Sequence, residues 1–510
     1  MKTLLRYILT FTALTCLISA QAQQINTLYF LENAPMRHTI NPAFQPISKG
    51  FVNISPLGWM SAGVGNTSLT VSDILFLDPQ TGKTITPLHP NGDKQTLLKT
   101  LNNMTLINGD ATLGIVNLGL RIKEKGFLTI GINEHIEVGA TLPRAIPQIM
   151  LGGFMTDLEG TNSFNLSRLG VAANVYTEIG VGYSHQINEK WTVGGKLKIL
   201  IGQANIGLTA KNLTLDASIE QWDINGNMQL GIVGPFNFEQ LPPIDGQNLM
   251  DIIDEATHIN PSELIDLSNP VKIAFGGGYG AAIDLGFAYK PNQNIQISAA
   301  LNDLGMIHWA NANVYNCTID TTFVGAGEFE YSDPAFHDQE GNFSTQLLLD
   351  SALSNMQGLA DAIRMKHSGN AYNKMVSAKL NLGVDATFLN NKLTVGLLSA
   401  TRLYNARLYE EITIGVGYKP FNWLNIAASY SLMNNGKFSN IGAGLSIMPK
   451  DGVNMTLALD YIPTTYAGID INGKTQYLLP YKSKMVNIAL GFSVCWGTNP
   501  KEEIIAPEQL

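Results

Sequence analysis

The sequence predicts an all-β membrane protein, an outer-membrane antiparallel β-barrel of about 14 strands. Three observations support this fold class. Apolar and small or polar residues alternate along many segments, the connections between these segments are sorted by length, and the chain begins with an export signal. We also expect an N-terminal periplasmic or plug segment and short helices in the loops.

The alternation is clearest near the C-terminus. From Val486 to Trp496 every second residue is apolar, and the residues between them are small or polar. The segments Val376 to Phe388 and Val453 to Tyr461 repeat this pattern. Because successive side chains of a strand point to opposite faces, each segment has one apolar face, which suits lipid. A soluble β-sandwich also alternates, but its outward face would carry more Lys and Glu.

Fourteen segments have strand character, and the barrel is expected over 51–496. In chain order they are 51–71 (with a kink at Pro56), 113–123, 127–138, 168–186, 191–202, 278–290, 294–304, 376–388, 392–403, 408–419, 423–432, 438–448, 453–462 and 485–496.

The connections between these strands favour a barrel over a sandwich. All the long ones are odd-numbered, and every even-numbered one is short. Short periplasmic turns and longer outer loops are typical of outer-membrane barrels, so both termini are expected in the periplasm. The region 305–375 is then an insert outside the barrel or folded into its lumen. The expected outer loops are 72–112, 139–167, 203–277, 305–375 and 463–484.

The N-terminus resembles a secretory signal. Lys2 and Arg6 precede an apolar run, and Ala20-Gln21-Ala22 is an A-x-A cleavage site, so residues 1–22 are expected to be removed. Within residues 23–50, the stretch 37–46 contains two prolines, which predicts an extended segment at the periplasmic mouth. The acidic residues 497–510 are expected to form a periplasmic tail.

Several loop segments have helical spacing of apolar residues. The amphipathic stretch Thr345 to Met365 is expected to pack on its own protein, with partner binding as the alternative. Residues 209–220 and 227–233 are expected to form a second hairpin that extends the ribbon beyond the membrane. Shorter helices are expected over 93–104, 145–151 and 249–256.

Charged residues on the small-residue faces are the candidate lumen lining. They could select or bind a solute, or they could pair with one another inside a plugged barrel. Both signs occur, so no strong ion preference is expected. The ten candidates are Arg121, Glu178, Lys196, Lys198, Asp284, Lys379, Asp385, Arg402, Glu411 and Asp460.

The sequence shows no catalytic signature. Its eight histidines do not fall at zinc-ligand spacing, and no G-x-S-x-G motif occurs. Cys317 and Cys495 give no disulfide framework. The formal net charge of -9 disfavours nucleic acid as a partner. No enzyme activity, metal or cofactor is therefore expected.

Four short motifs carry a resemblance to known barrels. Asn41-Pro42-Ala43 is similar to the N-P-A of FadL-type fatty-acid transporters and of the PorP/SprF-like and PorV-like barrels tied to type IX secretion. The chain more closely resembles an uncharacterised outer-membrane barrel family, known only as a domain of unknown function. The motifs are 37–44, which contains the N-P-A, 142–144, 193–202 and 301–309.

Two functions follow as hypotheses. The first is passive transport of a small or amphipathic solute through a FadL-like barrel, either past a plug that shifts or through a lateral opening in the wall. The alternative is a barrel that transports nothing and binds a periplasmic or surface protein. Both place the barrel in outer-membrane lipid of a Gram-negative bacterium.

Overall fold

The computed structural model describes residues 25–497 with internal gaps. The expected signal segment and the tail beyond Gly497 lie outside the described residues, as do nearly all of the expected helices over 249–256 and 345–365. The gaps are 78–83, 88, 90–91, 153–162, 218–220, 238–243, 248–250, 252–265, 267, 325–363, 405–406, 434–437, 449–451 and 471–475.

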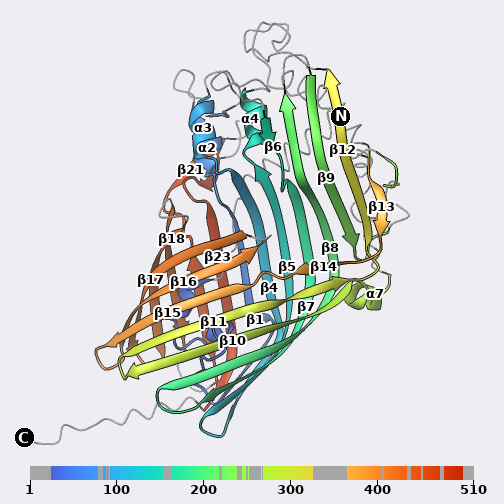
Figure 1. Cartoon of the computed structure of the whole chain (residues 1–510). Helices are drawn as coiled ribbons and strands as arrows, with labels where there is room; N and C mark the ends of the chain where they lie inside the picture. Colours follow the sequence, from blue (N-terminus) through green and yellow to red (C-terminus); the bar gives the residue numbers. More distant parts are fainter. Residues whose placement is uncertain are drawn as a thin grey trace, which may run out of the picture.

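Fourteen antiparallel strands close into a barrel, because β1 pairs with both β4 and β23 (Figure 1). The count and the predicted fold class are confirmed. Around the barrel the strands are β1 (Gly50–Asn66), β4 (Met104–Ile122), β5 (Gly126–Pro143), β7 (Gly170–Gln186), β8 (Trp191–Ala217), β10 (Gly278–Asn292), β11 (Ile295–Trp309), β15 (Lys379–Phe388), β16 (Leu393–Tyr404), β17 (Arg407–Phe421), β18 (Leu424–Met433), β19 (Phe438–Ile447), β20 (Asn454–Asp460) and β23 (Met485–Trp496).

The two ends of the barrel differ. The tight turns after β4, β7, β10, β15 and β17 gather at the lower end in Figure 1, which we call the short-turn end. Gly50 pairs with Trp496 there, so the chain enters and leaves the barrel at this end. The opposite, long-loop end carries the longer connections.

One side of the wall continues past the barrel at the long-loop end. β8 pairs with β10 as far as Gly202 and with β9 (Gln221–Val233) from Asn205 onward. The predicted second hairpin is therefore present. The predicted strands 191–202 and 294–304 end too early. The observed strands β8 and β11 continue beyond residues 202 and 304, because both remain paired with neighbouring strands there. The extension also contains β6 (Ser163–Asn165), β12 (Asn313–Val324), β13 (Lys366–Gly369) and β14 (Tyr372–Met375).

Short helices lie in the long loops. α3 (Lys94–Thr100) begins after Asp93, whose side chain accepts a hydrogen bond of 2.9 Å from the backbone of Thr96. It ends before 104, where the predicted helix ended, because β4 already begins there. In the described part of the chain, no helix combines the length and apolarity needed to cross a membrane. The remaining elements are α2 (Val71–Ile74), α4 (Ala145–Gly152), α7 (Pro270–Phe275), β2 (Phe76–Leu77), β3 (Thr84–Ile85), β21 (Tyr466–Asp470) and β22 (Gln476–Pro480).

The outer surface of the wall is apolar. Along β23, Ile488 and Leu490 are 36% and 40% exposed, whereas Ala489 between them is fully buried. The same outward apolar pattern recurs around the barrel, as expected for strands in lipid. Tyr461 is an exception. The alternation of 453–461 gave it an outward position, but β20 ends at Asp460, Tyr461 has a φ of 60°, and its side chain is buried.

Candidate functional site

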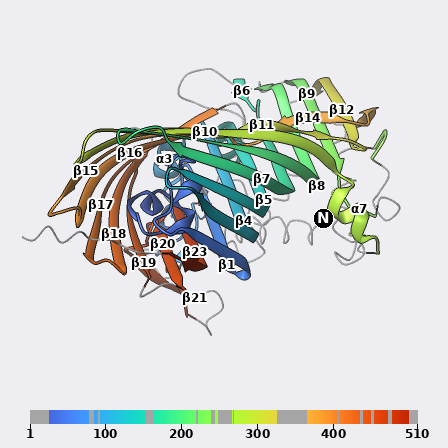
Figure 2. The same ribbon diagram turned by 90° about the horizontal axis from the view of Figure 1, so that it is seen from below.

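The N-terminal segment, residues 25–46, lies inside the barrel (Figure 2). It is not extended as predicted. It forms two 3-10 turns, η1 (Asn26–Phe30) and η2 (Pro35–Thr39). Pro35 starts the second turn, a position where its missing N–H costs nothing. η1 lies against five consecutive strands, β16 to β20.

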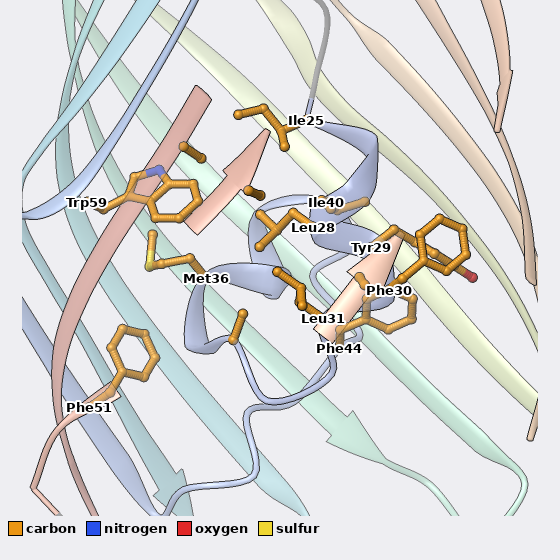
Figure 3. Close-up of a cluster of buried hydrophobic side chains, with 14 of the residues drawn as sticks. Ile25, Leu28, Tyr29, Phe30, Leu31, Met36, Ile40, Phe44, Phe51 and Trp59 are labelled. Carbon is orange, nitrogen blue, oxygen red and sulfur yellow. The ribbon is translucent and has the colours of Figure 1, made fainter. Parts of the chain in front are cut away.

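Apolar side chains of the segment fill the short-turn half of the lumen. Leu28, Tyr29 and Phe30 are at most 2% exposed. Figure 3 shows them in one cluster with Phe51 and Trp59, which β1 contributes from the wall. A barrel of this size would be too wide for its own side chains to fill, so the segment supplies the missing core.

Glycines form the part of the wall on which η1 packs. A Cβ at Gly415 would overlap the ring of Phe30, and a Cβ at Gly383 would overlap the hydroxyl of Tyr29. The segment therefore packs directly on the backbone of the wall, which only glycine permits. We call this surface the glycine-lined wall. Its members are Gly383, Gly396, Gly415, Gly417, Gly442 and Gly444.

The Asn41-Pro42-Ala43 motif attaches the segment to the opposite wall. The Asn41 amide donates hydrogen bonds of 3.2 Å to the carbonyls of Phe287 and Ala299 in β10 and β11. Its oxygen accepts one of 2.9 Å from the backbone of Ala43. One side chain thus fixes the turn and joins it to two neighbouring strands.

Acidic side chains hold the other end of the segment. Asp460 accepts hydrogen bonds from the backbone of Asn26 (2.6 Å) and Thr27 (3.3 Å) at the start of η1. Glu32 pairs with Lys419. Burial raises the pKa of Glu32, but the charges of Lys419 and Arg37 and the hydrogen bonds from Lys419 and Thr394 together outweigh burial and leave that pKa below its ordinary value.

A layer of paired charged side chains lies on the long-loop side of the segment. Lys198 is central, with Asp284 at 2.8 Å, Glu178 at 3.4 Å and Asp303 as a third partner. We call this set the ion-pair layer. Its members are Asp110, His135, Glu137, Glu178, Lys196, Lys198, Asp284, Asp303, Lys379 and Arg402.

Arg402 connects opposite walls. Its guanidinium lies 3.3 Å from Asp110 and 3.9 Å from Glu137. Arg402 is in β16, and Asp110 is in β4, seven strands away in either direction around the barrel. The ion pair therefore spans the lumen instead of joining neighbours along the wall.

All ten sequence candidates are buried or half-buried in the structure. Three contact the N-terminal segment, since Arg121 donates to Gln45 (2.9 Å) and Pro46, Asp385 accepts from Tyr29 (2.8 Å), and Asp460 binds η1. Glu411 accepts a hydrogen bond of 2.5 Å from the hydroxyl of Tyr461. The other six belong to the ion-pair layer.

Sequence reasoning missed four members of that layer. His135 and Glu137 share a face of β5 with Asn133, so their alternation was a usable signal. Asp110 was assigned to a loop because β4 begins earlier than expected. Asp303 has a φ of 59°, and no pattern in the sequence marks this irregularity. The described residues include no group of three or more His, Cys, Asp or Glu placed to hold a metal ion.

The wall is interrupted at β1. Its pairing with β23 shifts register between Val52 and Trp59, as the predicted kink at Pro56 required. Its pairing with β4 stops at Ile54 and resumes only at Asn66. We call residues 55–65 of β1, where they face β4, the β1 break.

β4 is irregular at the same level. Its register with β5 shifts between Gly114 and Val116, and a Cβ at Gly114 would touch Trp59 of β1. The two strands stay close there without a continuous hydrogen-bond ladder. Such bulges weaken local pairing and re-aim side chains.

A model described as "Family of unknown function (DUF5723)" matches residues 42–460, and that description assigns no activity. No curated protein matches the chain.

Three solved structures illustrate the structural likeness. A FadL homologue from Pseudomonas aeruginosa is 11% identical, with a TM-score of 0.41, over 94% of this chain and 100% of that one. The Pseudomonas putida toluene transporter TodX is 10% identical, with a TM-score of 0.37, over 94% and 95%. The Ralstonia pickettii toluene transporter TbuX is 10% identical, with a TM-score of 0.32, over 86% and 90%.

Proposed function

The chain belongs to the family of unknown function DUF5723, and we propose that its barrel is a passive route for a small amphipathic solute across the outer membrane of a Gram-negative bacterium. The β1 break carries this proposal. A closed barrel in lipid satisfies its backbone through continuous ladders, so an interrupted ladder between two strands is the weakest part of the wall.

The surroundings of the break favour an amphipathic solute. Trp59 turns inward from the break to the apolar cluster of the N-terminal segment, whereas Ile54 just below it is 61% exposed on the outside. Apolar side chains therefore lie on both sides of the wall at this point. A solute that left through the break would exchange an apolar interior for lipid.

Passage along the barrel axis would need a movement. The N-terminal segment fills the short-turn half of the lumen, and the ion-pair layer crosses it further up. A crevice beside His38 and Lys196 has a free volume of about 10 Å³, room for roughly one water molecule. A lateral path through the wall avoids displacing the segment, which is why we favour it.

A disulfide across the break tests the proposal. A Cβ at Gly109 of β4 would lie 3.2 Å from a methyl group of Val64 in β1, close to the geometry that a disulfide needs. The double variant Val64→Cys/Gly109→Cys, with Cys317→Ala and Cys495→Ala to remove the native thiols, can be reconstituted in liposomes. Swelling with butyl glucoside should be slow when oxidised and recover after reduction.

The control is Val64→Cys alone under the same two conditions. Equal swelling rates for the oxidised and reduced double variant would remove the lateral route. If neither form made the liposomes swell faster than empty liposomes, transport would be excluded altogether.

A second function has its own support. The packed segment and the cross-lumen ion pairs favour a sealed barrel that serves as a platform for a periplasmic or surface protein. Such a protein should remain bound when the barrel is extracted from the membrane. A substitution in the surface of the barrel that binds it should abolish this binding, and solute flux should stay at background with or without the substitution.

A further inference from the structure

The rim of the short-turn end is positively charged on an otherwise acidic protein. Among the described residues of this end, six exposed lysines lie against two exposed glutamates, Glu124 and Glu189, although the whole chain has a formal net charge of -9. We call these lysines the lysine rim. They are Lys49, Lys123, Lys125, Lys190, Lys290 and Lys392.

Neighbouring turns bring lysines together. The backbone N–H of Lys290 donates a 2.7 Å hydrogen bond to the carbonyl of Lys190, so these two lysines lie side by side on adjacent hairpins. Like charges on neighbouring strands repel each other unless an anion lies between them. Within the described residues, no lysine of the rim forms an ion pair.

Aromatic side chains place the rim at the edge of the lipid. Trp191, Trp423 and Trp496 are each 41–42% exposed near the ends of their strands at the short-turn end. Trp191 stacks on Tyr289 at 4.3 Å, and Phe421 stacks on Trp423 at 5.4 Å. Such aromatic side chains mark the level where acyl chains meet headgroups. The lysines in the adjoining turns therefore reach the headgroups.

We propose that the lysine rim binds the phosphate groups of anionic phospholipids in the leaflet at the short-turn end. Each ammonium group gains from the negative surface of such a leaflet, and its flexible stem lets it reach along the headgroup layer. The proposal depends on the barrel being in a bilayer. It holds whether or not any solute passes.

The long-loop end supplies a matched control. Its exposed lysines include Lys99, Lys211 and Lys366, but exposed carboxylates such as Asp216 and Asp320 lie on the same elements or their neighbours. Mixed charges of this kind give no net attraction for an anionic leaflet.

The experiment compares two triple variants of the full mature chain. Lys190→Gln/Lys290→Gln/Lys392→Gln removes half of the rim, and Lys99→Gln/Lys211→Gln/Lys366→Gln removes as many charges from the other end. Each is reconstituted in phosphatidylcholine containing phosphatidylglycerol and then extracted with its surrounding lipid in polymer discs. The lipid is quantified by mass spectrometry.

We expect phosphatidylglycerol to be enriched about threefold around the native protein. The rim triple variant should lose most of this enrichment, whereas the long-loop variant should keep it. Replacing the same three rim lysines by Arg should also keep it, which separates charge from folding. Enrichment that is absent, or equally reduced in both triple variants, would overturn the proposal.

The acidic residues after Gly497 are the competing occupant. If they cover the rim, a chain that ends at Gly497 should enrich phosphatidylglycerol and the full chain should not. That result would also overturn the proposal.

Discussion

The short-turn half of the lumen and the long-loop half are filled in different ways. In the first, Phe30 and its neighbours pack on the glycine-lined wall, so the fit depends on shape. In the second, Lys198 pairs with acidic residues of neighbouring strands and Arg402 pairs across the lumen, so the fit depends on charge. Packing resists small changes of pH and fails when volume changes. Ion pairs tolerate changes of volume and fail when one charge is lost.

The largest effect is expected from the packed half. Phe30→Ala should lower the free energy of unfolding by about 4 kcal/mol, because a fully buried ring leaves a cavity that the barrel wall cannot close. Urea unfolding in lipid vesicles, followed by tryptophan fluorescence, measures this change.

Gly415→Val examines the same contact from the wall. It should destabilise the protein by about 2 kcal/mol alone, and by much less when Phe30 is already Ala. Gly207→Ala is the control, because its Cβ would have no atom closer than 3.7 Å. Additive effects of Phe30→Ala and Gly415→Val would show that the two residues do not share one packing site.

The ion-pair layer should respond to loss of one charge. Arg402→Met should cost about 3 kcal/mol, because it removes the cation that pairs with both Asp110 and Glu137 inside the lumen. Adding Asp110→Asn and Glu137→Gln should recover most of that loss, since the uncompensated charges are then gone. A triple variant as unstable as Arg402→Met would indicate that Arg402 acts through packing.

The outer wall and many inward-facing residues could be predicted from the sequence, and the contacts of the interior could not. Alternation is local, so β15 and β23 could be located within a few residues. The strand number came from counting the alternating segments, and the connection lengths supported it because a closed barrel must alternate its ends. Alternation did not locate the end of the barrel part of β8, which continues to Ala217. The part of β8 beyond the barrel keeps the same alternation as the part within it.

The contacts of the interior join residues far apart in sequence. Arg402 and Asp110 are separated by 292 positions, and nothing near either residue indicates the other. The small inward face of β17 was visible in the sequence, but the reason for Gly415 is the ring of Phe30. A face of small residues predicts that something packs on it, and only the fold shows which segment does so.

Acid should weaken the packed half through one histidine. Burial lowers the pKa of His38 from 6.5 to about 4. Between these pH values the unfolded chain binds a proton that the folded chain does not, so stability should fall as pH drops from about 6.5 to 4. The loss attributable to His38 should reach about 2 kcal/mol. His38→Gln should flatten the pH dependence of unfolding in this range, and an unchanged slope would exclude His38 as its source.

The smallest effect concerns the ion pair that lies within the packed half. Against burial, Lys419, Arg37 and the hydrogen bond from Thr394 together hold the pKa of Glu32 below its ordinary value. The carboxylate therefore contributes stability above that ordinary value and loses it as pH falls through the lowered one. Lys419→Gln should cost about 1 kcal/mol at pH 7, because the hydrogen bond of 2.8 Å from Thr394 still satisfies Glu32. The double variant Glu32→Gln/Lys419→Gln should cost no more than Lys419→Gln alone. If Lys419→Gln and Arg402→Met lowered the free energy of unfolding by the same amount, surrounding packing would not protect an ion pair. The two halves would then differ only in the types of residue that fill them.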